Sequence, residues 1–147
     1  MSGSKKARAA ARLSAVQALY QYDMEGTPEA SLLDEFHRHR LGMEIDDEQF
    51  TRAEVPFFND IVKGVIARRD EIDELLTGKL ATGWSLARLD KTMLQILRAG
   101  SYELMARADI PTGAAISEYV DVAHAFFNER EAKFVNGVLD AVAKAVR

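Results

Sequence analysis

The chain has 147 residues, a formal net charge of −4 at pH 7 and no cysteine. This length corresponds to one ordinary domain, which can bury enough apolar surface to fold without disulfides, and the lack of cysteine excludes thiolate chemistry. The first residues lack the apolar core of a secretory signal, and no stretch reaches the roughly 20 apolar residues that span a bilayer. We therefore expect a cytoplasmic protein with no membrane segment.

Helical periodicity runs through the N-terminal half, where period-two strand patterns are missing. A first apolar stripe extends from about 7 to 24 and ends at a Gly-Thr-Pro sequence, and a second covers 29–40. Residues 41–55 are polar and acidic and predict a loop. The strongest stripe runs from 56 to 80, with a charged run on its other side.

The C-terminal half predicts three further helices after a short turn at 85–89. Asp90 is a good N-cap for a helix to about 104, and Thr112 is placed to cap a helix that reaches Phe127. A last helix follows Asn128 and extends to Val146. The chain is thus predicted to be all-α with about seven helices, whose short connections favour antiparallel neighbours.

No catalytic or metal-binding constellation can be assembled from the sequence. His37 and His39 are separated by one residue, a spacing that does not put two imidazoles on one helical face, and His124 fits a structural role. No glycine-rich loop follows a strand, and no serine has a nucleophile-elbow context. We therefore expect a protein that is not an enzyme and needs no cofactor or metal.

The positive charge is concentrated at the start of the chain. Residues 1–22 contain four basic and no acidic residues, whereas the remaining 15 basic and 23 acidic residues carry −8. On a helix Lys5, Arg8 and Arg12 fall within an arc of about 60°, and a helix N-terminus adds positive potential. Together with Lys6 they form a strip suited to the phosphates of a single strand or loop. A solvated helix start that only aids solubility is the alternative.

Aromatic rings beside such cations are the usual stacking surfaces for unpaired bases. Tyr20, Tyr22 and Phe134 are the candidates, although core packing is the commoner use for Tyr20 and Phe134 taken singly. An Asn-Gly pair, normally a turn signal, also interrupts the stripe of the last helix. Gly137 would allow a close helix contact, and Asn136 would bond a neighbouring backbone or RNA; the sequence does not separate these uses.

Five segments carry a more specific signal. They are "SAVQALYQYDMEG" (14–26), "FFNDIVKGV" (57–65), "LDKTMLQILRAGSYEL" (89–104), "DIPTGAAISEYVDVAHAF" (109–126) and "KFVNGVLD" (133–140). In this order they closely resemble the NusB family of bacterial transcription antitermination factors. The resemblance covers nearly the whole chain, and the last segment is the most specific.

The resemblance implies two small helical bundles packed together in one RNA-binding domain over residues 1–147, with halves of about 1–80 and 84–147. It also implies a non-enzymatic role. Members of the family pair with the small-subunit ribosomal protein NusE. The pair binds the boxA element of nascent RNA within the RNA polymerase antitermination complex, notably during ribosomal RNA transcription. A homodimer is an alternative state when the partner is absent.

The resemblance also assigns roles to residues of this sequence. Those implied to bind RNA are Lys5, Lys6, Arg8, Arg12, Arg130, Lys133, Phe134 and Asn136. The first four would contact phosphates, and the last helix would contribute the 133–136 region near the RNA path. Tyr20 matches an aromatic of the first motif and is expected near the NusE contact or the RNA edge.

Three departures from the family pattern modify these expectations. Alanines at 9–11 replace further arginines, which suggests weaker intrinsic RNA affinity and more dependence on the partner. Met93 and Leu94 replace a charged pair, so they either enlarge the core or form an apolar partner patch. Arg130, in an expected loop, stands where relatives often carry an acid and would attract phosphate.

Two alternative functions remain open at the level of sequence. One is a NusB-like module or fragment of a ribosomal RNA cytosine methyltransferase; the lack of a methyltransferase domain before Arg147 argues against it unless the chain is a fragment. The other is a helical interaction adaptor that does not bind RNA.

Overall fold

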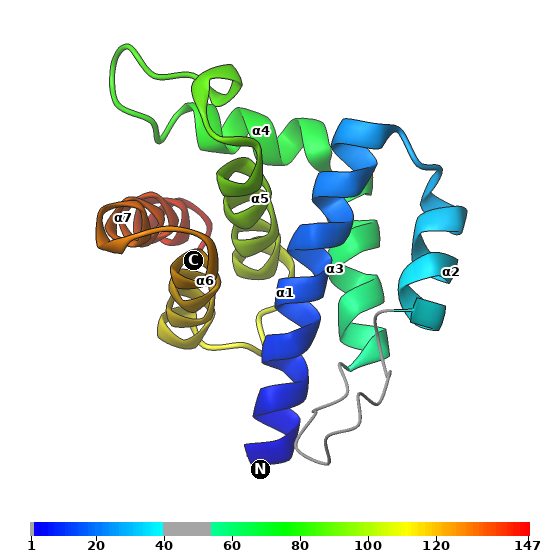
Figure 1. Ribbon diagram of the computed structural model, residues 1–147. Helices are drawn as coiled ribbons and strands as arrows, with labels where there is room; N and C mark the ends of the chain where they lie inside the picture. Colours follow the sequence, from blue (N-terminus) through cyan, green and yellow to red (C-terminus); the bar gives the residue numbers. More distant parts are fainter. Residues whose placement is uncertain (1, 40–53) are drawn as a thin grey trace. The chain divides into compact units, whose positions relative to one another are not determined.

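The computed structural model describes residues 2–39 and 54–147 (Figure 1). Over these ranges the chain forms seven α-helices and one short 3-10 helix, which confirms the all-α prediction. The predicted loop at 41–55 lies almost entirely outside the described residues. Internal contacts group the chain into two compact units, Met1–Lys63 and Gly64–Arg147, and each is described by itself.

The first unit contains α1 (Ser2–Glu25), α2 (Glu29–His39) and the beginning of α3 (Val55–Ala67). The basic start of the chain is helical, because α1 begins about five residues before the predicted boundary. Gly26, at φ 71°, ends α1 in the left-handed conformation that only glycine adopts without strain. Its N–H donates to the Tyr22 carbonyl at 3.1 Å. In the core of this unit, the Phe36 and Phe58 rings stack at 5.6 Å.

The apolar stripe over 56–80 is divided between α3 and α4 (Arg69–Thr77) and ends before 80. The helices meet at Arg68, whose backbone leaves the helical region at φ −111° and ψ 23°. The Arg68 guanidinium donates two 2.9 Å hydrogen bonds to the Glu71 carboxylate in the first turn of α4. These bonds hold the pKa of Glu71 below its usual value and raise the pKa of Arg68.

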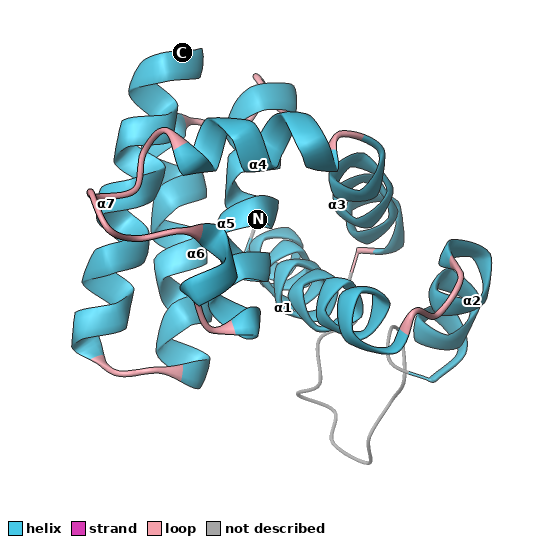
Figure 2. Ribbon diagram, turned by 90° about the horizontal axis from the view of Figure 1, so that it is seen from above, coloured by secondary structure: helices cyan, strands magenta, loops and turns pink. Residues whose placement is uncertain are grey.

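The second unit is built around α5 (Lys91–Ala106), α6 (Thr112–Phe126) and α7 (Glu129–Val146), which pack on one another. Figure 2 shows α6 and α7 side by side. Helix α4 packs against α5 and α7, and η1 (Leu86–Arg88) contacts α4. All residues from 93 to 104 of α5 are buried. None of the helices described is long and apolar enough to cross a membrane.

The caps of the last three helices agree only in part with the predictions. Asp90 caps α5 as predicted, since its Oδ1 accepts from the backbone N–H groups of Thr92 and Met93 at 2.8 and 3.1 Å. The predicted Thr112 cap is wrong: Thr112 is the first residue of α6, and its hydroxyl accepts a hydrogen bond from Arg147 at 3.0 Å. Helix α7 starts after Asn128, as predicted.

The close helix contact expected at Gly137 occurs at Gly100. A Cβ on Gly137 would meet no atom within 4 Å, whereas one on Gly100 would lie 2.8 Å from Cδ1 of Leu139. Gly100 therefore lets α7 approach α5, and the packing explanation for Gly137 is wrong.

Helix α5 also buries polar side chains, most of which are paired. Arg98 donates two 2.8 Å hydrogen bonds to the Asp73 carboxylate. The Tyr119 hydroxyl donates a hydrogen bond to the buried Glu103 carboxylate. Among the described side chains, Ser101 Oγ is buried without a hydrogen-bond partner. Paired charges let α5 pass through the core at a much smaller desolvation cost than unpaired ones.

Candidate nucleic-acid interface

The basic strip on α1 contains two kinds of cation. Lys5 and Lys6 are exposed on the first turns of the helix. Arg8 retains 33% of its side-chain exposure, and Arg12 is only 4% exposed. The two lysines are therefore the groups of the strip that can reach a phosphate without rearrangement, and Arg8 is partly accessible.

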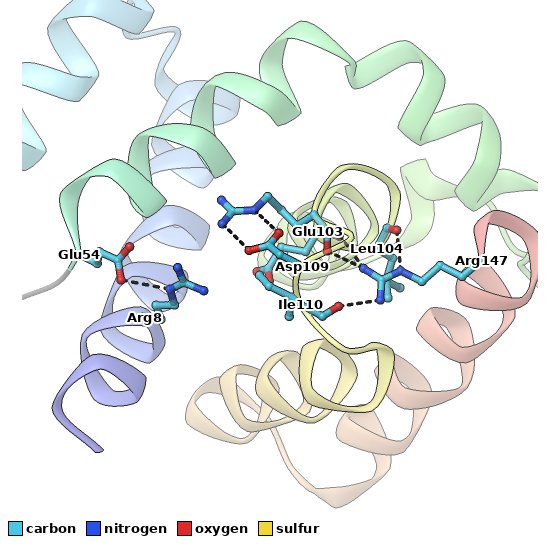
Figure 3. Close-up of polar contacts among 8 residues, drawn as sticks. Arg8, Glu54, Glu103, Leu104, Asp109, Ile110 and Arg147 are labelled. Carbon is cyan, nitrogen blue, oxygen red and sulfur yellow. Dashed lines mark hydrogen bonds and ion pairs between the residues drawn. The ribbon is translucent and has the colours of Figure 1, made fainter. Parts of the chain in front are cut away.

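Both arginines of the strip rest on one aromatic ring. The guanidinium carbons of Arg8 and Arg12 lie 4.8 and 4.9 Å from the centre of the Phe57 ring, at the start of α3. Arg8 Nε also donates to Glu54 Oε2 at 3.1 Å (Figure 3). The Glu54 backbone N–H donates to the carbonyl of Ala7 at 3.1 Å. These contacts hold the strip in place and set the direction of Arg8.

Tyr20, the predicted partner contact, is 38% exposed. It lies eight residues beyond Arg12 on α1, about 12 Å along the helix axis. Its partial exposure leaves ring surface for a partner, and the sequence alone did not distinguish this from core packing.

The other predicted RNA-binding residues gather at the start of α7. Arg130, Lys133 and Asn136 are exposed, and Phe134 is half-buried. Arg130 was expected in a loop but lies in the first turn of the helix, because the helix begins at Glu129. The Glu131 carboxylate accepts a hydrogen bond from the Asn128 N–H at 3.2 Å, which fixes this end of the helix.

Phe134 and Arg130 line a groove of about 650 Å³ in the second unit. Trp84, Arg88 and Phe127 also line this groove, although no functional role was predicted for them from the sequence. Trp84 is the single tryptophan of the chain and is 53% exposed. It lies in the Thr-Gly-Trp-Ser stretch, which interrupts the helical pattern. An aromatic side chain in a loop is a sign of a functional role, and this sign was present in the sequence.

Met93 and Leu94, the substituted pair on α5, are both buried. They enlarge the core and do not form an exposed apolar patch, although Met93 also reaches the wall of the groove. Within the described ranges, no three His, Cys, Asp or Glu side chains gather where they could hold a metal ion.

Comparison with known proteins supports the family suggested by the sequence motifs. The sequence model of the NusB family matches residues 9–144. The chain belongs to the NusB family. It is 73% identical over 144 residues to the transcription antitermination protein NusB of Novosphingobium aromaticivorans, with 98% of this chain and 97% of the relative covered. The NusB of Sphingopyxis alaskensis is 61% identical, with 100% of this chain and 99% of the relative covered.

Solved NusB structures share the fold. A crystal structure of Thermotoga maritima NusB aligns with a TM-score of 0.75 at 28% identity, over 93% of this chain and 90% of that one. A crystal structure of antitermination factors NusB and NusE in complex with double-stranded RNA aligns with a TM-score of 0.79 at 27% identity, over 95% and 98%. The protein is a transcription antitermination protein, and family membership confirms that it is not an enzyme.

Proposed function

We propose that this protein binds boxA RNA together with NusE and acts in the cytoplasm as an RNA-binding adaptor of the RNA polymerase antitermination complex. The proposal treats residues 1–147 as one RNA-binding domain. The observation that supports it most is the similarity, over 95% of the chain, to a NusB solved with NusE and double-stranded RNA.

In this proposal the strip on α1 holds the RNA backbone. Lys5 and Lys6 contact phosphates directly because they are exposed, and Arg8 joins them by exchanging Glu54 for a phosphate oxygen. Arg12 is buried on Phe57, so its main contribution is to hold α1 in place and to add positive potential.

The start of α7 supplies the second set of RNA contacts. Lys133 and Arg130 are exposed cations, and the exposed Asn136 amide can both donate and accept hydrogen bonds at a base edge. Phe134 offers part of its ring for stacking. Tyr20, which belongs to α1, is assigned to the NusE contact.

The test is fluorescence anisotropy of a short labelled single-stranded boxA RNA, with and without NusE, against a scrambled RNA of the same composition. We expect tighter binding to boxA that strengthens with NusE. Lys5→Ala with Lys6→Ala should weaken binding, and so should Arg8→Ala with Arg12→Ala. Lys63→Ala with Lys144→Ala removes equal charge from exposed positions elsewhere and should bind like the wild type.

Equal binding of boxA and scrambled RNA, with and without NusE, would contradict the proposal. It would favour a helical interaction adaptor without specific RNA binding. The contacts of Arg8 and Arg12 with Phe57 are the observation that fits this second candidate, because they give both arginines a structural use.

A further inference from the structure

The groove beside Phe134 contains side chains to which the proposed RNA and NusE contacts assign no role. It lies where α5 and α7 begin, and the loop that carries Trp84 forms part of its wall. All of its lining residues belong to the second unit, so its shape depends on that unit alone.

Three aromatic side chains offer flat surface to this groove. Trp84 has 53% of its surface exposed, and Phe127 and Phe134 are half-buried. An exposed tryptophan beside two partly exposed phenylalanines is a concentrated apolar patch, which marks an interaction site. Unpaired bases bind such rings by stacking, whatever their identity.

The charges around the groove favour an anionic ligand. The Arg88 guanidinium carbon lies 5.5 Å from the centre of the Trp84 ring, and its Nη1 donates to the Gly83 carbonyl at 2.7 Å, which holds the loop. Arg130 is exposed on the opposite element, α7.

The two acidic residues of the groove are partly compensated. Asp90 accepts from two backbone N–H groups at the start of α5, and Glu131 accepts from the Asn128 N–H at the start of α7. Each carboxylate thus faces a helix N-terminus, which offsets part of its charge. The two guanidinium groups therefore dominate what a ligand meets.

We propose that this groove stacks an unpaired base of the bound RNA against Trp84, while Arg88 and Arg130 contact the adjoining phosphates. This inference rests on the proposed function, since it needs the protein to bind RNA. It adds Trp84 and Arg88 to the RNA-binding residues and requires the base to be unpaired, because a paired base does not present its face to a ring.

The first test observes Trp84 directly. Protein made with 5-fluorotryptophan has a single ¹⁹F resonance, because Trp84 is the only tryptophan of the chain. We expect the resonance to shift when boxA RNA is added to the protein with NusE. RNAs with one abasic nucleotide at each position in turn should identify the stacked base, since one of them should bind without the shift.

The second test measures RNA affinity by anisotropy. Trp84→Ala should weaken binding by roughly tenfold, the usual effect of losing one stacked base. Trp84→Phe keeps a flat ring and should recover most of the affinity, and Arg88→Gln should weaken binding and reduce its salt dependence. Val146→Ala is the control, because Val146 is an exposed apolar residue (37%) at the other end of α7 that does not line the groove.

The outcomes separate this inference from the proposed function. If the wild type binds no RNA, both fail. If RNA binds but the ¹⁹F resonance does not move and Trp84→Ala retains wild-type affinity, only the groove inference is overturned. If NusE alone shifts the resonance and RNA causes no further shift, the groove inference is also overturned. The groove would then be identified as a binding site for NusE.

Discussion

Individual residues decide how much of the basic strip is available to a ligand. The sequence identified Lys5, Lys6, Arg8 and Arg12 as one cluster, but the acid that faces Arg8 stands 46 residues later in the chain. No local pattern connects residues so far apart. The structure therefore adds a competitor for the phosphate, Glu54.

Removing that competitor should strengthen RNA binding. Partly exposed ion pairs of this kind contribute about 0.2–1 kcal/mol, so Glu54→Gln should raise RNA affinity by up to about fivefold. It should also steepen the dependence of log K on log salt, since Arg8 would engage a phosphate more fully. Anisotropy titrations at several salt concentrations provide the measurement.

Glu25→Gln is the control for the loss of one negative charge. Glu25 is exposed at the other end of α1, about 25 Å from Arg8 along the helix. That distance exceeds the Debye length of about 10 Å at 0.1 M salt. Equal effects of the two substitutions would mean that net charge, and not the ion pair with Arg8, controls affinity.

Gly100 in α5 and Gly137 in α7 should respond in opposite directions to alanine. Gly100→Ala should lower the free energy of unfolding by about 1–3 kcal/mol, because its Cβ would crowd the buried Leu139 side chain. Gly137→Ala should raise it by about 0.5–1 kcal/mol, because that position is exposed with open space around it. Urea denaturation measures both, and a loss of stability in Gly137→Ala would contradict the packing described.

At the scale of elements, the ends of helices explain which predictions were correct. The helix starts at Asp90 and Asn128 were predicted correctly because a helix cap involves residues within about three positions of one another in the chain. The prediction for Thr112 was wrong because its hydroxyl accepts a hydrogen bond from Arg147, 35 residues away. The apolar stripe over 56–80 forms two helices because the backbone of Arg68 leaves the helical conformation. Periodicity alone does not report such a break, since apolar residues continue on both sides of it.

The end of α7 should stabilise the end of α5. The Arg147 guanidinium donates to the carbonyls of Leu104 and Ile110 at 3.0 and 2.7 Å (Figure 3). It also donates to the Arg107 carbonyl at 2.7 Å and to the Thr112 hydroxyl. The Leu104 carbonyl belongs to the last turn of α5, and the other two carbonyls belong to the connection between α5 and α6, so Arg147 ties the end of α5 to that connection.

Arg147→Ala should therefore lower the free energy of unfolding by about 1–2 kcal/mol, since hydrogen bonds from a charged donor are lost. Lys144→Ala, which removes an exposed ion pair with Asp140 in the same helix, should change it by less than about 0.5 kcal/mol. Thermal or urea unfolding followed by circular dichroism compares the two. Equal stabilities would show that the Arg147 contacts contribute nothing beyond a surface charge.

At the scale of the whole molecule, charge is segregated along the chain. Residues 1–22 carry +4, and the remainder carries −8. A polyanion is attracted by the first and repelled by the second, so its binding is expected to depend strongly on orientation and salt.

The proposed phosphate contacts are three cations on α1 (Lys5, Lys6, Arg8) and two on α7 (Arg130, Lys133), so log K against log salt should have a slope of about −3.5 for single-stranded RNA. Lys5→Ala with Lys6→Ala should make that slope shallower by about 1.4, because two of the contacts are removed. The measurement is anisotropy from low to high salt. A slope near zero would mean that the strip does not contact phosphates in the complex.

The sequence by itself determined the helical class, most helix boundaries, the charge segregation and the family, because each depends on residues close together in the chain or on motifs in order. Only the tertiary structure decided that Arg12 is buried on Phe57, that Gly100 and not Gly137 is the close contact, and that Trp84 shares a groove with Phe134. These features arise between residues tens of positions apart. Burial and contact at such separations follow from how the helices pack, which no local pattern encodes.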